Sequence, residues 1–197
     1  MAENLPKEER RSQIMEAAMK VFTQKGYSSA RMDDIVEASG LSKGAIYHHY
    51  EGKKEIFLAL IGHWETQTFP DFYSRNGKER SASDTLRDFA KEIINVFKTR
   101  SYVFHAEVEF WSLSNQDDEV RKRSQDLYEK IINLFELVIN KGMRNKEFIT
   151  VDSRLTAIYI LSVFQGINWF CIFNDKKINA KNYIENAIKM ILSGLKK

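Results

Sequence analysis

Cysteine, proline and glycine are scarce in this sequence, which excludes several classes of protein. The 197 residues include one cysteine, two prolines and nine glycines. The single cysteine, Cys171, excludes an intramolecular disulfide framework and a metal site built from several cysteines, so we expect a reducing, cytoplasmic location. So little proline and glycine excludes a fibrous or low-complexity chain and favours helices.

The sequence also lacks a large excess of positive or negative side chains. The chain has 30 lysine and arginine residues against 27 aspartate and glutamate residues, and its net charge of +3 does not by itself indicate a nucleic-acid-binding protein. Residues 1–55 contain nine positive and nine negative side chains. If nucleic acid is the partner, the placement of the cations must create the binding surface.

Long apolar runs are missing with one exception, residues 155–173, LTAIYILSVFQGINWFCIF. This run is uncharged and is about as long as a membrane-spanning helix. It also contains Thr156, Ser162, Gln165 and Asn168, and the sequence offers no second candidate. We therefore expect a helix that is buried in a core or a subunit interface, and no membrane partner.

Helical periodicity predicts an all-α fold. Apolar residues recur with helical spacing in four stretches, and no comparable stretch keeps the two-residue alternation of a half-buried strand. The four stretches are residues 14–22, 86–97, 127–138 and 184–195.

Glycine, proline and polar segments indicate where the helices end. We expect Gly26 to cap the first helix and Gly142 to close the third. Pro70 should end or kink a helix that begins near Lys53, because proline lacks the amide donor. Connecting loops are expected at residues 74–83 and 174–179.

Residues 31–50, RMDDIVEASGLSKGAIYHHY, carry a pattern of two short helices. The first has an apolar face and ends in a turn at Gly40, and Ser42 can cap the second. Ile46 can pack inward from this second helix. The order predicts the DNA-reading helix-turn-helix, although a glycine turn between any two helices gives the same coarse pattern.

More specific features lie within residues 26–57. They are Gly26-Tyr27, Ser39-Gly40-Leu41-Ser42-Lys43-Gly44, Ile46-Tyr47-His48-His49-Tyr50 and Lys53-Lys54-Glu55. Together they resemble the DNA-binding head of the TetR family of transcriptional regulators.

The resemblance implies a chain of two parts. A three-helix helix-turn-helix head, residues 1–52, would be joined to a larger helical body, residues 53–197, that binds a ligand and dimerises. The resemblance also implies a homodimeric repressor that a small molecule releases from an inverted-repeat operator in double-stranded DNA.

The second short helix supplies most of the candidate DNA contacts. Lys43 can donate to a guanine edge or a phosphate, and Ala45 can touch a thymine methyl group. Tyr47 and His48 are suited to phosphates, as are the amides at the start of this helix. The resemblance adds Lys53 and, with an undefined role, Arg31. The full set is Arg31, Ser42, Lys43, Gly44, Ala45, Tyr47, His48 and Lys53.

Each of these assignments has a structural alternative. Tyr47 could be a packing aromatic, and Lys53 and Lys54 could form an ordinary solvated face. The adjacent pair His48-His49 could suggest a metal. Neighbouring helical residues point in different directions, however, and no cysteine or third histidine lies nearby, so we expect no metal site.

The body is rich in aromatic residues, most of which should be core. A ligand cavity would also be mainly apolar with a few polar groups, and carboxylates among aromatics would suit a hydrophobic or cationic compound. The alternative is that these polar groups face solvent or pair with one another. The candidate lining residues are Trp64, Phe89, Phe104, Glu107, Trp111, Tyr128, Gln165 and Trp169.

The resemblance assigns the last two helices to a four-helix dimer interface. A two-fold dimer would present two recognition helices to an inverted repeat. A purely intramolecular core is the alternative. The candidate interface residues are Ile160, Phe164, Ile167, Ile184, Ile188 and Ile191, and Gly166 beside them permits close helix contact.

No arrangement of catalytic residues is apparent, so we expect no enzymatic activity, no cofactor and no catalytic residue. Cys171 lies in an apolar stretch and resembles a buried hydrophobic residue. The sequence therefore predicts a ligand-responsive DNA-binding transcriptional regulator. Repression is the expected mode, while activation or a role as a protein-interaction module on the same fold stays open.

Overall fold

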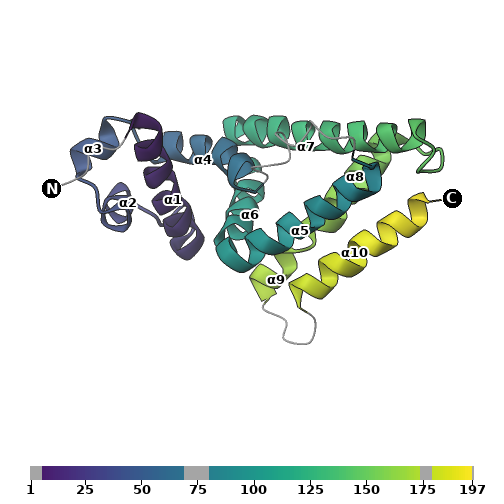
Figure 1. Cartoon of the computed structure of the whole chain (residues 1–197). Coiled ribbons are helices and arrows are strands. Elements are labelled where there is room, and N and C mark those ends of the chain that lie inside the picture. Colours follow the sequence, from purple (N-terminus) through teal and green to yellow (C-terminus); the bar gives the residue numbers. More distant parts are fainter. Residues whose placement is uncertain (1–5, 69–79, 174–178, 197) are drawn as a thin grey trace. The chain divides into compact units, whose positions relative to one another are not determined.

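The computed structural model describes residues 6–68, 80–173 and 179–196, except for the side chains of residues 64–68. Every regular element within these residues is a helix (Figure 1). The predicted all-α fold is therefore confirmed.

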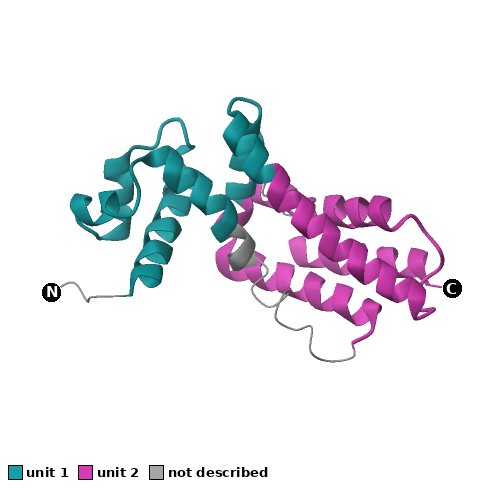
Figure 2. Cartoon of the chain, turned by 90° about the horizontal axis from the view of Figure 1, so that it is seen from above, with its two compact units in different colours: residues 1–67, 105–124 teal, residues 68–104, 125–197 magenta. Residues whose placement is uncertain are grey.

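The chain divides into two compact units (Figure 2). The first unit contains residues 1–67 and 105–124, and the second contains residues 68–104 and 125–197. The first unit is thus larger than the head predicted at residues 1–52, because it includes residues from later helices. The functional boundary at residue 52 stays a prediction.

The first unit begins with the short helices of the head. It contains α1 (Lys7–Lys25), α2 (Met32–Ser39), α3 (Lys43–Tyr47) and nearly all of α4 (Lys53–Thr68), with parts of α6 (Tyr102–Ser114) and α7 (Asp118–Arg144). The first predicted apolar stripe is buried on α1, at Ile14, Ala17, Ala18, Val21 and Phe22.

Gly26 ends α1, as predicted. Its backbone has φ 73° and ψ 153°, a conformation that side chains resist, and its N–H donates to the carbonyl of Phe22 at 2.8 Å.

The second unit is a bundle of longer helices. It contains α5 (Ala82–Arg100), α8 (Ser153–Gln165), α9 (Asn168–Phe173) and α10 (Ala180–Leu195), with the rest of α7 and the first residues of α6. Helix α10 packs against α5 and α8 (Figure 1). The Phe89 ring lies 4.7 Å from the ring of Phe135 and 5.2 Å from that of Phe164, which places Phe89 in the core of this unit.

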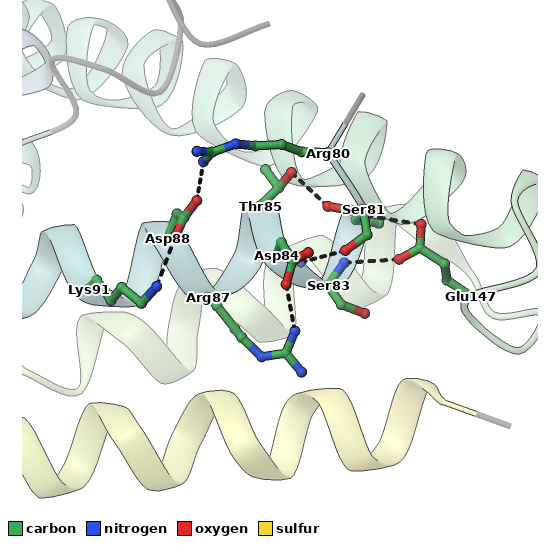
Figure 3. A network of polar contacts seen from close by, with 10 residues as sticks. Arg80, Ser81, Ser83, Asp84, Thr85, Arg87, Asp88, Lys91 and Glu147 are labelled. Atoms are coloured by element: carbon green, nitrogen blue, oxygen red, sulfur yellow. Dashed lines mark hydrogen bonds and ion pairs between the residues drawn. The ribbon is translucent and has the colours of Figure 1, made fainter. Parts of the chain in front are cut away.

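The start of α5 is held by two acceptors (Figure 3). Ser81 is the N-cap, and its hydroxyl accepts from the N–H of Asp84 at 3.0 Å. The Glu147 carboxylate accepts from the N–H of Ala82 at 3.1 Å and from that of Ser83 at 3.2 Å. Three amides at the helix start are therefore satisfied by side chains.

One predicted helix end is wrong. Helix α7 does not close at Gly142 but continues to Arg144, and the chain turns at Lys146, which has φ 60°. Gly142 instead makes room for the Phe148 ring, which a Cβ at this position would overlap.

The other predicted breaks are partly described. Asn179 caps α10, since its side-chain oxygen accepts from the N–H of Asn182 at 2.8 Å. The loop predicted at residues 74–83 is too long, because Ala82 and Ser83 already belong to α5. Pro70 and the predicted loop residues 74–79 and 174–178 lie outside the described residues.

The uncharged run falls on α8 and α9. Within the described chain, Ser153–Phe173 is the one stretch long and apolar enough to cross a membrane by length and composition. The helices are separate, because α8 ends at Gln165 and α9 begins at Asn168. Such a stretch is weak evidence for a membrane span, because core helices of soluble proteins pass the same test.

Candidate functional site

The two short helices of the head form the predicted helix-turn-helix. Gly40 takes the left-handed conformation, φ 67° and ψ 15°, in the turn between α2 and α3. Ser42 caps α3, and its hydroxyl oxygen accepts from the N–H of Ala45 at 3.2 Å. Ile35 of α2 and Ile46 of α3 are both fully buried, so the apolar faces of the two helices point into the head.

The opposite face of α3 is exposed. Lys43, Gly44, Tyr47 and His48 are all exposed on it, and Ala45 is half-buried. The Tyr47 ring is 44% exposed, which does not fit the alternative that it is a packing aromatic. A Cβ at Gly44 would meet only open space, so nothing covers the backbone there among the described residues. We call the exposed residues of α3 with Ser42 the reading surface.

Lys43 has an acidic partner in its own chain. Its ammonium lies 2.8 Å from the Asp33 carboxylate of α2, and both side chains are exposed. The hydrogen bond to Asp33 raises the pKa of Lys43. The spacing of residues within α2 and α3 did not indicate this pair, because it depends on how the two helices cross.

Arg31 occupies the N-cap position of α2. Its backbone N–H donates to the Asp34 carboxylate at 2.8 Å, and Lys25 binds the same carboxylate at 2.7 Å. The hydrogen bond from Lys25, followed by that from Arg31, lowers the pKa of Asp34. The Arg31 side chain itself is exposed.

The Lys53 ammonium binds backbone carbonyls of its own chain. The Nζ atom donates to the backbone carbonyls of Tyr27 at 2.7 Å, Ala30 at 2.9 Å and Ser28 at 3.4 Å. It also lies 4.4 Å from the centre of the Tyr27 ring. The structure therefore does not bring the Lys53 side chain to the reading surface with the residues of α3.

Lys54 is engaged as well. Its ammonium pairs with Asp117 at 2.7 Å and with Glu119 at 3.2 Å. The hydrogen bond from Lys54 lowers the pKa of Asp117. The two neighbouring lysines are thus not an ordinary solvated face.

The adjacent histidines have different environments. His48 is exposed and His49 is half-buried, with their ring centres 5.1 Å apart. No group of three or more His, Cys, Asp or Glu side chains within the described residues could hold a metal ion.

A cluster of cations near these histidines was missed by the sequence reasoning. Burial, followed by the charges of His48, Arg11, Lys7 and Arg10, lowers the pKa of His49. Three of these residues lie at the start of α1, and Arg11 also lies 5.1 Å from the centre of the Tyr50 ring. The signal was the run KEERR at residues 7–11, which has three cations against two anions and whose cations act on His49.

The predicted pocket residues lie in different environments. Phe89, Phe104 and Glu107 are buried, whereas Trp111 and Trp169 are exposed. Tyr128 and Gln165 are half-buried, and the side chain of Trp64 lies outside the described residues. Glu107 and Trp111 belong to the first unit, and the other described members belong to the second.

Grooves described in the second unit are lined by other residues. A groove of about 410 Å³ runs between α5 and α10, with an apolar floor and a mainly cationic rim. Its lining is Arg87, Ala90, Lys91, Ile94, Glu185, Ile188, Lys189, Leu192, Ser193 and Lys196. The predicted pocket therefore stays a prediction.

Comparisons with known proteins agree with the geometry of the head. Residues 14–60, which include the helix-turn-helix, match the model of bacterial regulatory proteins of the tetR family. The head of this chain is thus a DNA-binding head of the TetR type. A stretch of 57 residues, 29% of this chain and 26% of its relative, is 44% identical to the transcriptional activator FasR of Mycolicibacterium smegmatis.

The likeness to TetR-family regulators extends over the body. The chain is 23% identical over 191 residues to the transcriptional regulator QacR of Staphylococcus aureus, covering 95% of this chain and 98% of QacR. The crystal structure of a protein described as a transcriptional regulator from Saccharomonospora viridis, in complex with choline, shares the fold with a TM-score of 0.83 at 17% identity. That comparison covers 97% of this chain and 100% of the other.

The residues predicted for a TetR-type dimer interface lie mostly inside the second unit, and their role in a dimer stays a prediction. Ile160, Phe164, Ile167, Ile184 and Ile191 are buried within the second unit, and Ile188 lines the α5–α10 groove. The helical spacing of the apolar residues identified the face of α8 and of α10 that packs inside the protomer. Helices α8, α9 and α10 expose other large apolar side chains, which are Leu155, Ile158, Tyr159, Trp169, Ile172, Phe173 and Met190.

Gly166 makes a close helix contact, but within the chain. A Cβ at Gly166 would overlap the hydroxyl of Tyr183 on α10, and that hydroxyl donates to the carbonyl of Val163 at 2.6 Å.

Proposed function

We propose that the chain is a cytoplasmic, homodimeric transcriptional repressor that a small molecule releases from an inverted-repeat operator. The observation that carries the DNA-binding part is the reading surface, where Lys43, Tyr47 and His48 are exposed on a helix whose inner face is buried. A helix presented in this way fits the major groove, with base contacts from its first residues and phosphate contacts around them.

The test is a mobility-shift screen of the DNA upstream of the chain's own gene. Binding should fall with salt, because phosphate contacts release counterions. Replacing Lys43 or Tyr47 with alanine should weaken operator binding by roughly 1–3 kcal/mol each. Undiminished binding by a folded Lys43→Ala, Tyr47→Ala double variant would contradict the assignment.

The buried carboxylate of Glu107 supports a cationic or hydrophobic effector. Among the acidic side chains that the structure describes, Glu107 is the one that is buried, at 2% exposure, and it lies between the buried aromatics Phe104 and Phe110 along α6. A buried carboxylate attracts a cation more strongly than an exposed one does. The choline bound to the structural relative is a ligand of this class.

Replacing Glu107 with glutamine tests the effector class. The change keeps the shape of the side chain and removes its charge, so release from the operator by a quaternary ammonium compound should need at least about tenfold more compound. Release by an uncharged compound should change less. Equal loss for both would show that Glu107 supports the fold of α6 without recognising charge.

The effector acts by shifting the equilibrium between the DNA-binding form and the DNA-free form of the protein. A ligand that prefers the DNA-free form lowers operator affinity, and operator DNA must then lower ligand affinity by the same factor. Titrating the ligand with and without operator measures both factors. A ligand that binds equally well in both titrations does not drive release.

The exposed apolar residues of α8, α9 and α10 support homodimerisation. Leu155 and Tyr159 on α8, Trp169 on α9 and Met190 on α10 are each more than half exposed. Large exposed apolar groups mark interaction surfaces, and the last helices are the dimer contact that the TetR resemblance implies. We place the interface on this face instead of on the buried isoleucines.

Activation is a second candidate function. It is favoured by the relative FasR, which is named an activator. A reporter gene fused to the operator separates the two modes, because deleting the regulator raises expression under repression and lowers it under activation. A third outcome, no change of expression and no DNA binding, would indicate a protein-interaction module on this fold.

A further inference from the structure

The loop between α1 and α2, residues 26–30, is held by two side chains of opposite charge. The first is Lys53 at the start of α4. An ammonium group has three N–H donors, and the carbonyls of Tyr27, Ser28 and Ala30 accept from this one. The position of the ammonium over the Tyr27 ring adds a cation–π contact.

The second side chain is Glu109 of α6. Its carboxylate accepts from the backbone N–H of Tyr27 at 3.2 Å. Both residues belong to the first compact unit. The positive Lys53 ammonium therefore binds carbonyl oxygens of the loop, which carry partial negative charge. The negative Glu109 carboxylate binds an amide N–H of the same loop, which carries partial positive charge, so both interactions are favourable.

The loop is also anchored by its aromatic residue. The Tyr27 ring lies 5.4 Å from that of Phe22 on α1 and 4.7 Å from that of Phe57 on α4. Phe57 in turn lies 5.4 Å from Phe110 on α6. The loop thus contacts the same two later helices that supply Lys53 and Glu109.

The position of the loop determines where α2 begins. Ala30, whose carbonyl Lys53 binds, is buried and directly precedes the N-cap of α2. Helix α2 contacts α1 and α3. A shift of the loop would therefore move α2 and, through it, the reading surface.

We propose that Lys53 and Glu109 are positioning residues that hold the α1–α2 loop and, through it, the start of α2. Lys43 is the comparison within the same head, since 61% of its side chain is exposed. The consequence for DNA binding rests on the proposed function. The holding of the loop does not, because it can be measured without DNA.

Lys53→Met is the first test, with Lys43→Met as its matched control. Methionine keeps the stem over Tyr27 and removes the three donors. We expect the thermal midpoint of the DNA-free protein to fall by about 5 °C for Lys53→Met and by less than about 1 °C for Lys43→Met. Amide hydrogen exchange at residues 26–30 should become at least about tenfold faster only in Lys53→Met. Equal behaviour of the two variants would overturn the proposal.

Glu109 provides a second test if Lys53→Met does not fold. Glutamine keeps an oxygen that can accept from the Tyr27 N–H, whereas leucine does not. Glu109→Gln should retain the wild-type midpoint and exchange rates to within about 1 °C and twofold, and Glu109→Leu should lose about 3–5 °C and accelerate exchange at Tyr27. The same result for both variants would overturn the role of Glu109.

The salt dependence of DNA binding separates positioning from phosphate contact. Lys53→Met should bind operator more weakly with the wild-type slope of log affinity against log salt. If the Lys53 ammonium lay on a phosphate, that slope would fall by about 0.9 for each protomer, and this outcome would overturn the proposal for the DNA-bound form, because the ammonium would have left the loop. If the wild-type chain bound no operator, the proposed function would fail, while the midpoint and exchange would still decide whether Lys53 holds the loop.

Discussion

At the scale of single residues, an acid of α2 lies beside the reading surface. The Asp33 carboxylate pairs with Lys43 in the free protein, and both groups are well exposed. If Lys43 binds a base edge or a phosphate as proposed, it must leave this partner, and Asp33 would then repel the nearby phosphates. We therefore expect the pair to lower non-specific affinity and to favour sites whose specific contacts compensate for its loss.

Asp33→Asn should tighten DNA binding. An exposed pair contributes about 0–1 kcal/mol, so we expect operator affinity to rise by up to about fivefold, with a larger relative rise for non-specific DNA. Fluorescence anisotropy at two salt concentrations measures both. Glu37→Gln is the control, because it removes the same charge from an exposed position of α2 without breaking the pair. Weaker binding by Asp33→Asn would show instead that Asp33 orients Lys43 for reading.

His49 should make the head sensitive to mild acid. Its Nδ1 atom is buried and has no hydrogen-bond partner within the described residues, and its pKa is held below the ordinary histidine value by burial and by the charges of His48 and Arg11. A histidine with a lowered pKa stabilises the fold above its unfolded pKa. This contribution is lost as the pH falls below about 6.5 towards the folded pKa, because the unfolded chain binds the proton first.

Thermal unfolding at pH 7.5 and pH 5.5 tests this effect. Between pH 7.5 and pH 5.5, the thermal midpoint of the wild type should fall more than the midpoint of His49→Gln, because glutamine does not bind a proton in this pH range. His48→Gln should reduce the pH dependence less than His49→Gln does, because it removes only one of the charges that lower the pKa of His49. A pH dependence that persists in His49→Gln would assign the effect to other groups.

At the scale of elements, the structure separates local signals from long-range ones. The start of α3 was predictable because Ser42, Gly40 and Ile46 act within a few residues of one another. The holding of the α1–α2 loop was not, since Lys53 lies 23 residues or more from its carbonyl partners and Glu109 lies 82 residues from Tyr27. A lysine at a helix start looks the same in sequence whether it meets a phosphate or a carbonyl.

The start of α5 depends on another such long-range contact. Glu147 lies 65 and 64 residues from Ala82 and Ser83, whose buried amides it accepts from. Removing the carboxylate leaves these two N–H groups without an acceptor. Glu147→Ala should therefore lower the free energy of unfolding by about 2 kcal/mol.

Chemical denaturation measures this loss. Glu147→Gln is the control, because its amide oxygen can still accept one of the two hydrogen bonds, and it should lose less than Glu147→Ala. Equal stability of Glu147→Ala and the wild type would show that water satisfies the start of α5.

At the scale of the whole molecule, the question is which apolar face meets a second copy. Periodicity identified α8 and α10 as apolar helices but could not distinguish the face that packs within the protomer from one that meets a partner. Burial makes this distinction, since Ile160 and Ile184 are fully buried whereas Tyr159 and Met190 remain 57% and 71% exposed. Tyr159 and Met190 line one groove of about 310 Å³ with residues of α8 and α10.

Met190→Glu should therefore break the dimer without unfolding the protomer. The side chain is exposed in the single chain, so the charge costs little there, whereas in a dimer it would be buried against apolar groups and weaken association by about 10–100-fold. Light scattering should show a shift from dimer to monomer, and operator affinity should fall with it, because one protomer can occupy only one half-site. Leu137→Glu is the matched control, since Leu137 is 63% exposed on α7 and does not belong to the helices of the proposed interface, and it should leave the dimer intact. If Met190→Glu remains dimeric while Leu137→Glu becomes monomeric, the second copy binds to α7, and the inverted-repeat spacing would have to be derived from that interface instead.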